Sequence, residues 1–469
     1  MGYLDNSGLS YLWGKIKTAL GGKQDKESSV SVPGSGALSM SETLGSGPYT
    51  IEFTEEAGSG ESSGESFAIG DVRLTTKTGL GENWVLANGT IISAEDYPKY
   101  VEEFPFKFGT SYKENLFGET SGPSGNSVLQ YINGNYICVL QSKIYYASSP
   151  DANWTESVII PAGSSGTIND FLFANGYYVA ASQFYDSDHW VSRVWYASDL
   201  NGPWSAVDVH QSTGTASYGN SIQFINGQFV LMTTETISSA TKYYLYTAQS
   251  PDGAWTAIPL DFLPQVRRIV YAEGKYVLCV MQQDENSTWH VGLKYASSLN
   301  GPWEYQDVYE KQGSFSPSLF TYLNGKYLIF QSYAYSTGSY NAVLFSDSIG
   351  GEWTFQEFSL RDGIIRAVTY DAGTYYAAFC GSKTVSSTVT YYLGCAFSED
   401  LQSWATGYSS TLTAGSIISC GVLVHDYFLI VSVMANTPPT NHGIRYYDMR
   451  FRKLPTINIA GANTFIKVG

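Results

Sequence analysis

The chain contains 469 residues and carries 42 acidic against 26 basic side chains, which gives a formal net charge of -16 at pH 7. Because the sequence lacks a strong basic patch, this charge repels phosphates and excludes nucleic acid as a partner. No stretch approaches the roughly 18 to 20 apolar residues of a membrane-spanning helix, so we expect no membrane insertion.

The chain begins with a predicted amphipathic helix, which lies in an attachment segment at residues 1–25. Between 4 and 20, apolar residues recur at helical spacing: Leu9, Leu12, Trp13, Ile16 and Leu20. A lone helix of this length is marginal in water, so its apolar stripe needs a partner. Residues 26–66 are rich in Gly, Ser and Glu and predict an extended connector, interrupted by one strand-like run at 48–56.

The composition changes at residues 67–110. The stretch IGDVRLTTKTGLGENWVLANGTIISAEDYPKY (69–100) resembles the tail-collar segment of bacteriophage and prophage tail-fibre proteins, through GDVR at 70–73, WVLANG at 84–89 and Tyr97-Pro98. The first 26 residues and the closing KLPTINIAGANTFIKVG (453–469) are similar to the ends of tail-fibre proteins from phages of Gram-positive bacteria.

The resemblance implies a location in the tail of a virion or of a prophage-derived particle. It implies a homotrimer whose N-terminal region contacts other tail or baseplate proteins. It also implies that the C-terminal segment, 453–469, returns to a small collar-like base, so that residues 122–452 form an inserted domain.

Residues 122–452 repeat one phrase, which is clearest in VWYASDLNGPWSAV at 194–207. Each copy has a β-branched and aromatic run, a turn of Pro, Asp, Asn and Gly, and a Trp that opens a second apolar run. These tryptophans recur about every 50 residues: Trp154, Trp204, Trp255, Trp303, Trp353 and Trp404.

A second hairpin precedes each phrase. Its two-residue turns are Asn133-Gly134, Asn175-Gly176, Asn226-Gly227, Glu273-Gly274, Asn324-Gly325, Ala372-Gly373 and, in a degenerate seventh copy, His425-Asp426. Asn-Gly suits a type I′ turn, in which both residues have positive φ. Two hairpins per repeat make a four-stranded sheet, so we predict a mainly β protein with a seven-bladed β-propeller; a solenoid is the rival fold.

The last blade lacks the Trp phrase. Its fourth strand is therefore expected from one of two segments, 454–460 or 111–118. The turn before each Trp resembles the Asp-box of sialidase-like propellers, for instance at Ser250, Asp252, Gly253 and Trp255. The spacing is tighter than in that family, so the resemblance supports the fold and transfers no catalytic residue.

Variable loops between the second and third strands are predicted to share one face with the connections between blades. They span 183–193, 233–242, 282–290, 331–341, 381–390 and 435–443. Functional residues commonly lie on such loops above a rigid scaffold. We therefore predict that this face is the binding surface.

A polar residue stands six positions before each inner turn. These seven residues should surround the mouth of the central channel: Ser127, Asn169, Asn220, Arg267, Ser318, Arg366 and Ser419. The sequence leaves two roles open for these side chains: contact with a ligand, or hydrogen bonds to backbone groups or to water in the channel.

Aromatic side chains in the loops are further binding candidates. Trp190 and Trp289 occupy equivalent positions and could either stack on sugar rings or pack between blades. Polar and aromatic neighbours in these loops complete the predicted ligand-binding set, with Tyr185, Asp188, His189, Tyr333 and Tyr335.

The five cysteines, Cys138, Cys279, Cys380, Cys395 and Cys420, have no CxxC spacing and predict buried free thiols. Cys380 and Cys395 could face each other on neighbouring strands. Asp186, Asp188 and His189 lie close in sequence but lack the spacing of a metal site. We expect no cofactor and no metal.

The sequence as a whole favours a receptor-binding protein at a phage tail tip, with a bacterial surface polysaccharide or a teichoic acid as the partner. A glycan-degrading enzyme is the first alternative. It would draw on arginines near the loop face, Arg267, Arg268, Arg361 and Arg366, and on the carboxylates of Asp170, Asp261, Asp284 and Asp362, which are ordinarily solvated loop acids. The N-terminal Arg motif of sialidases is absent, and no Tyr-Glu pair stands out. A purely structural tail component is the second alternative.

Overall fold

The computed structural model describes residues 28–32, 36–40, 51–54, 72–75, 80, 83–87, 91–103, 112–118, 127–160, 166–186, 188–212, 221–237, 240–286, 288–311, 315–335, 338–358, 363–385, 388–412, 417–435, 442–453 and 463–467. The chain divides into two compact units. One combines Met1–Thr110 with Asp448–Gly469, and the other spans Ser111–Tyr447. The predicted helix at 4–20 lies outside the described residues.

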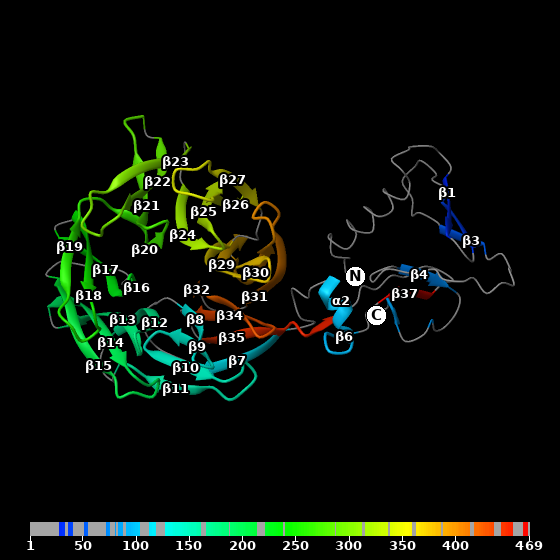
Figure 1. Ribbon diagram of the computed structural model, residues 1–469, viewed down its shortest axis with the longest axis horizontal. Helices are drawn as coiled ribbons and strands as arrows, with labels where there is room; N and C mark the ends of the chain where they lie inside the picture. The colour runs from blue at the N-terminus through cyan, green and yellow to red at the C-terminus, as the bar shows by residue number, and fades with distance from the viewer. Residues whose placement is uncertain are drawn as a thin grey trace. The chain divides into compact units, whose positions relative to one another are not determined.

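The larger unit is a seven-bladed β-propeller of four-stranded antiparallel blades, as the repeats predict (Figure 1). Blade one contains β8 (Ser127–Ile132), β9 (Asn135–Leu140), β10 (Lys143–Ala147) and β11 (Thr155–Val158). Blade two contains β12 (Gly166–Ala174), β13 (Tyr177–Asp186), β14 (His189–Ala197) and β15 (Ser205–Ser212). Blade three contains β16 (Ser221–Ile225), β17 (Gln228–Ile237), β18 (Ala240–Ala248) and β19 (Thr256–Leu260).

The next three blades repeat this order, from the inner strand to the outer one. Blade four contains β20 (Pro264–Ala272), β21 (Lys275–Gln283), β22 (Trp289–Ala296) and β23 (Glu304–Lys311). Blade five contains β24 (Phe315–Leu323), β25 (Lys326–Tyr335), β26 (Gly338–Ser346) and β27 (Thr354–Phe358). Blade six contains β28 (Ile364–Asp371), β29 (Thr374–Val385), β30 (Thr388–Ser398) and β31 (Ala405–Leu412).

Blade seven is built from both ends of the propeller segment. Its inner edge consists of β32 (Ile417–Ser419) and β33 (Val422–His425), followed by β34 (Phe428–Ala435) and β35 (His442–Asp448). The outer strand is β7 (Tyr112–Gly118), which pairs antiparallel with β35. Of the two segments expected to supply this strand, the structure uses the N-terminal one. Blade seven also packs against blade one, so the ring is closed and the solenoid alternative is wrong.

All seven inner turns have positive φ at both residues, as a type I′ turn requires. The turn of blade seven is Asp426-Tyr427, with φ of 46° and 63°, one residue later than the pair expected from the sequence. Neither residue is glycine, so this turn lacks the sequence signal shared by the other six inner turns.

The core lies between blades, because the second strands are buried on both faces. In β9, Ile137 and Val139 pack with blade two, whereas Cys138 and Leu140 pack with blade seven. Side chains alternate across a strand, so one strand contributes to two neighbouring clusters. This explains the nearly unbroken apolar runs in the sequence.

The smaller unit contains short strands and one described helix. Strands β1 (Ser28–Val32), β2 (Gly36–Met40) and β3 (Ile51–Thr54) form a three-stranded sheet, β36 (Phe451–Lys453) pairs with β6 (Ile91–Ser93), and β37 (Asn463–Lys467) lies between β4 (Val72–Thr75) and β5 (Trp84–Leu86). The helix α2 spans Pro98–Glu103.

The strand-like run expected at 48–56 is confirmed as β3, but β1 and β2 were not predicted in the extended connector at 26–66. Three strands occupy this range, and β1 and β2 pair in register from Ser28 with Met40 to Val32 with Gly36. The alternation in SSVSV is a strand pattern that the Gly and Ser content conceals. Among the described residues, no helix has the length and apolar character needed to cross a membrane.

Candidate functional site

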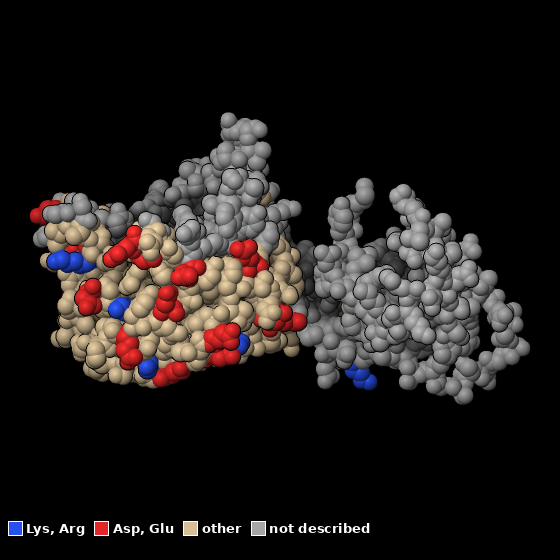
Figure 2. Space-filling view, turned by 90° about the horizontal axis from the view of Figure 1, so that it is seen from above, with Lys and Arg blue, Asp and Glu red and all other residues tan. Residues whose placement is uncertain are grey.

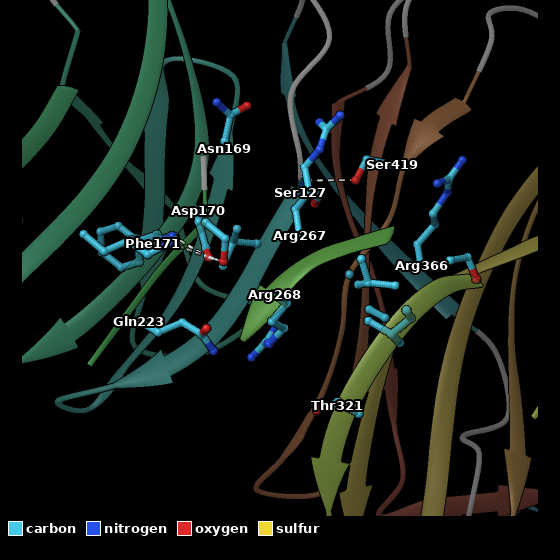
Figure 3. A pocket seen from close by; sticks show the side chains of 18 of the residues that line it. Ser127, Asn169, Asp170, Phe171, Gln223, Arg267, Arg268, Thr321, Arg366 and Ser419 are labelled. Carbon is cyan, nitrogen blue, oxygen red and sulfur yellow. Dashed lines mark hydrogen bonds between the residues drawn. The ribbon is translucent and has the colours of Figure 1, made fainter. Parts of the chain in front are cut away.

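The candidate site is a cavity of about 1670 Å³ at the centre of the propeller, lined by residues from the inner strands of all seven blades (Figure 3). Six of the seven polar residues predicted to surround the channel mouth contribute to its lining. They are Ser127, Asn169, Arg267, Ser318, Arg366 and Ser419. The seventh, Asn220, lies outside the described residues.

Several of these residues sit at irregularities of the inner strands. The pairing register shifts around Asn169 in β12, around Ser318 in β24 and around Arg366 in β28. A β-bulge places an extra residue on one strand and re-aims its side chain. The bulges therefore place a polar side chain toward the cavity on strands whose other residues are mostly packed between blades.

A longer irregularity in β20 brings a further residue, Arg268, into the cavity lining. The six-residue spacing before the inner turn had assigned only Arg267 to the channel. The register of β20 shifts between Pro264 and Ile269, and both Arg267 and Arg268 line the cavity. In a regular strand two successive side chains point to opposite faces. The adjacent Arg-Arg pair in an inner strand was the available signal, but the bulge could not be placed from the sequence.

Asp170 also lines the cavity, and its side chain is hydrogen-bonded to blade three. Its carboxylate accepts hydrogen bonds from Phe171 N at 2.9 Å, Ser221 Oγ at 2.9 Å and Ile222 N at 3.1 Å. Burial raises the pKa of Asp170, although the charge of Arg268 and the three hydrogen bonds act in the opposite direction. Asp170 therefore joins blades two and three, and its oxygens are occupied by protein donors.

Two of the predicted loop aromatics reach the cavity. Tyr185 at the end of β13 and Trp190 at the start of β14 form a cross-strand pair, with ring centroids 5.3 Å apart and an interplanar angle of 62°. Both line the cavity. Nearby, the Nδ1 atom of His189 lies 2.7 Å from Asp188 Oδ1, and this pair is solvent-accessible.

Trp289 does not share the position of Trp190. It packs against the cluster between blades four and five, which includes Val266 and Val291, and it is absent from the cavity lining. The two tryptophans are equivalent in the repeat, but the structure gives Trp289 the interblade role that the sequence left open. Of Tyr333 and Tyr335, the structure describes only the backbone, in β25.

The cysteines are buried and free, as predicted. The expected facing of Cys380 and Cys395 is wrong, because the register pairs Cys380 with Leu393 and Cys395 with Ala378. Cys380 lies instead beside Cys420 of blade seven. A hydrogen bond with Cys420 and the guanidinium of Arg366 lower the pKa of Cys380 despite its burial.

The lining offers little acid–base machinery. Asp170 is the one acidic residue among the described lining residues, whereas glycoside hydrolysis needs two carboxylates close together. Within the described parts of the chain, His, Cys, Asp and Glu form no group of three or more that could hold a metal ion. The arrangement provides positive charge, hydrogen-bonding groups and aromatic faces, which are the means of binding a polar ligand.

The geometry defines a β-propeller with a polar central cavity, and comparisons with known proteins add the following. No protein-family model and no curated protein matches the chain. Similar solved structures include a polysaccharide lyase, the PL25 ulvan lyase bound to a sulfated disaccharide repeat, at 9% identity over 73% of this chain and 98% of that chain, with a TM-score of 0.47.

Two further structures have TM-scores of 0.39. The Trypanosoma rangeli sialidase bound to sialic acid is 12% identical over 73% of this chain and 59% of that chain. The β-propeller domain of the Trilobed protease from Pyrococcus furiosus is 9% identical over 76% of this chain and 98% of that chain.

Proposed function

We propose that the protein is a receptor-binding protein of a phage or prophage tail, and that it binds a bacterial surface glycan at the loop end of the propeller cavity. The observation that carries the proposal is the cavity itself. Polar side chains from all seven blades and the Tyr185–Trp190 pair line one continuous space of about 1670 Å³.

The size and lining of the cavity suit a saccharide. Drug-sized ligands occupy pockets of roughly 300–1,000 Å³, so this cavity has room for several sugar rings. Aromatic faces contact the apolar faces of sugars, and hydroxyl, amide and guanidinium groups satisfy the sugar hydroxyls. Tyr185 is 48% exposed, so its ring is available to a ligand.

The location in a tail rests on the two ends of the chain, which resemble tail-fibre proteins. Strand pairing within the smaller unit supports this proposal. Strand β37 from the C-terminal end lies between β4 and β5 from the N-terminal region, so both ends of the chain contribute to one unit. In this proposal the propeller binds the surface glycan and the other unit attaches to the tail.

The first experiment incubates the full chain with purified cell-wall polysaccharide from candidate hosts, and measures retention on the polysaccharide and release of new reducing or unsaturated ends. Retention without product supports the proposal. Product formation would favour the glycan-degrading alternative. Neither retention nor product from any candidate would overturn the binding role and leave a structural tail component.

Trp190→Ala localises the binding, and Tyr305→Ala is the matched control, because Tyr305 is an exposed aromatic residue on the outer strand β23. We expect Trp190→Ala to weaken retention by about 1–3 kcal/mol, as for an aromatic contact at the centre of a binding site. Tyr305→Ala should leave retention unchanged.

A further inference from the structure

The charge of the cavity is opposite to that of the protein. The described lining residues include three cations, Arg267, Arg268 and Arg366, and one acid, Asp170. The chain as a whole has a net charge of -16, and Figure 2 shows acidic side chains spread over one side of the propeller. The cavity is therefore a local excess of positive charge within an acidic molecule.

Two of these arginines have partners other than an ion pair: the charge of Arg268 acts on Asp170, and Arg366 forms a hydrogen bond with Cys380. Within the described parts of the chain, neither Arg268 nor Arg366 has a carboxylate within salt-bridge distance, whereas Arg193 pairs with Asp208 at 2.5 Å and Arg445 with Glu114 at 2.5 Å. Both cavity arginines are exposed to the cavity space. In this respect the cavity arginines differ from Arg193 and Arg445.

The positions of these side chains describe a path. In Figure 3 the side chains of Arg267 and Arg366 point toward the same end of the cavity, and Arg268 lies nearer its middle. Arg366 is the third residue of β28 and lies near the loop end, and Arg267 is the fourth of the nine residues of β20. A ligand that enters from the loops would meet positive charge at the entrance and again further in.

This arrangement of charges favours anionic ligands over neutral ones. A concave site lined by one sign of charge concentrates ions of the opposite sign, and the low-dielectric walls strengthen the field. A guanidinium group binds carboxylate or phosphate oxygens through two parallel hydrogen bonds, which a neutral hydroxyl cannot match. Asp170 interacts with Arg268 through its charge, but its oxygens accept their hydrogen bonds from Phe171, Ser221 and Ile222.

We propose that the glycan segment entering the central cavity is anionic, and that its oxyanions, carboxylates of a uronic acid or phosphodiesters of a polyol-phosphate polymer, pair with Arg268 and Arg366. This inference rests on the proposed receptor-binding function and narrows its ligand. The shared chemistry is an oxyanion repeated along a saccharide or polyol chain.

The test uses the full chain and three defined polymers of similar length: an oligogalacturonate, a poly(glycerol phosphate) and a neutral glucan. Isothermal titration calorimetry gives the dissociation constant of each at low and high salt. We expect one of the two anionic polymers, or both, to bind, and the neutral glucan to bind at least 10-fold more weakly. Affinity for the anionic polymer should fall as salt rises. The carboxylate and phosphate arms identify which oxyanion the site prefers.

Three variants connect binding to the arginines. Arg268→Gln and Arg366→Gln should each weaken binding of the anionic polymer about 10-fold or more, as expected for loss of a charge-assisted hydrogen bond. Arg268→Lys should fall between the wild type and Arg268→Gln, because it keeps the charge and loses the paired donors. Arg193→Gln changes the net charge equally outside the cavity and should leave binding unchanged.

The results separate this inference from the function on which it rests. Equal binding of neutral and anionic polymers, or binding that survives in the Arg268→Gln/Arg366→Gln double variant with an unchanged melting temperature, overturns the anionic ligand. Retention on whole cell-wall polysaccharide would then still support receptor binding. If the protein binds neither the defined polymers nor any cell-wall material, both proposals are wrong.

Discussion

The side-chain amide of Asn226 donates a hydrogen bond of 3.0 Å to the hydroxyl of Tyr276, and so ties the inner turn of blade three to the second strand of blade four. The same bond recurs at two other blade boundaries: Asn133 with Tyr178 at 3.0 Å and Asn324 with Tyr375 at 3.2 Å. The asparagine that adopts positive φ in the turn therefore also connects neighbouring blades through its side chain.

Replacing this asparagine by glycine isolates the interblade bond. Asn226→Gly keeps a residue that accepts positive φ and removes the bond to Tyr276, so we expect a loss of about 0.5–1.5 kcal/mol in urea unfolding. Asn175→Gly is the control, since Phe229 of blade three offers no hydroxyl at the corresponding position. Equal losses at both sites would mean that the glycine itself, and not the bond, sets the cost.

Closure of blade seven depends on a glycine. A Cβ added at Gly443 of β35 would lie 2.2 Å from the carbonyl oxygen of Asn115 and 3.0 Å from Leu116 Cα, both on β7. Because backbone cannot rotate aside as a side chain can, Gly443→Ala should destabilise the propeller by about 1–3 kcal/mol.

The matched control is Gly350→Ala, in a turn where an added Cβ meets nothing within 4 Å. It should leave stability unchanged or raise it by up to about 1 kcal/mol, because alanine restricts the unfolded chain. Thermal unfolding of both variants checks the prediction, which fails if Gly443→Ala melts at the wild-type temperature.

The two equivalent tryptophans should respond differently to truncation. Trp289→Ala removes a side chain packed against the cluster between blades four and five, and we expect it to lower the free energy of unfolding by about 2–4 kcal/mol. Trp190→Ala should change stability less and binding more. Denaturant melts combined with binding per folded molecule distinguish the two effects; a larger stability loss for Trp190→Ala would contradict the assignment.

Two histidines should titrate on opposite sides of their ordinary pKa of 6.5. A hydrogen bond of 2.7 Å to Asp307 and the charges of Asp307 and Asp284 raise the pKa of His290. Burial lowers the pKa of His210, with Glu235 acting in the opposite direction. The stabilisation from His290 is complete below pH 6.5 and is lost as pH rises through its raised folded pKa.

Titration of the imidazole resonances by NMR measures both values directly. Asp307→Asn should move the His290 midpoint down toward 6.5 and leave that of His210 in place. A His290 midpoint at or below that of His210 in the wild type would show that the Asp307 pair does not form in solution.

The propeller could be predicted because its signals are local and repeated. The inner turns and the Trp phrase each indicate a backbone geometry within a few residues, and the seven inner turns, together with six Trp phrases, indicate the blade number. The position of Arg366 on the cavity wall followed from the same periodicity. The strands at 28–40 were missed, since short Ser-rich strands owe their pairing to partners that composition does not reveal.

The remaining features depend on irregularities that have no sequence code. The bulge between Pro264 and Ile269 brings Arg268 into the cavity, and a one-residue change of register decides which face a side chain occupies. Trp190 and Trp289 occupy the same place in the repeat, yet only the packing of each blade against its neighbour decides which one faces the cavity.

Closure of the ring by β7 has a mechanical meaning. Tyr112 of β7 pairs with Tyr447 of β35, so the chain enters and leaves the propeller at adjacent points of one blade. Tension applied to the rest of the chain therefore acts on β7 and β35, which are paired with each other where the chain enters and leaves the propeller. The load does not pass around the other six blades, so a pull on the chain outside the propeller acts on blade seven and not on the cavity walls of the other blades.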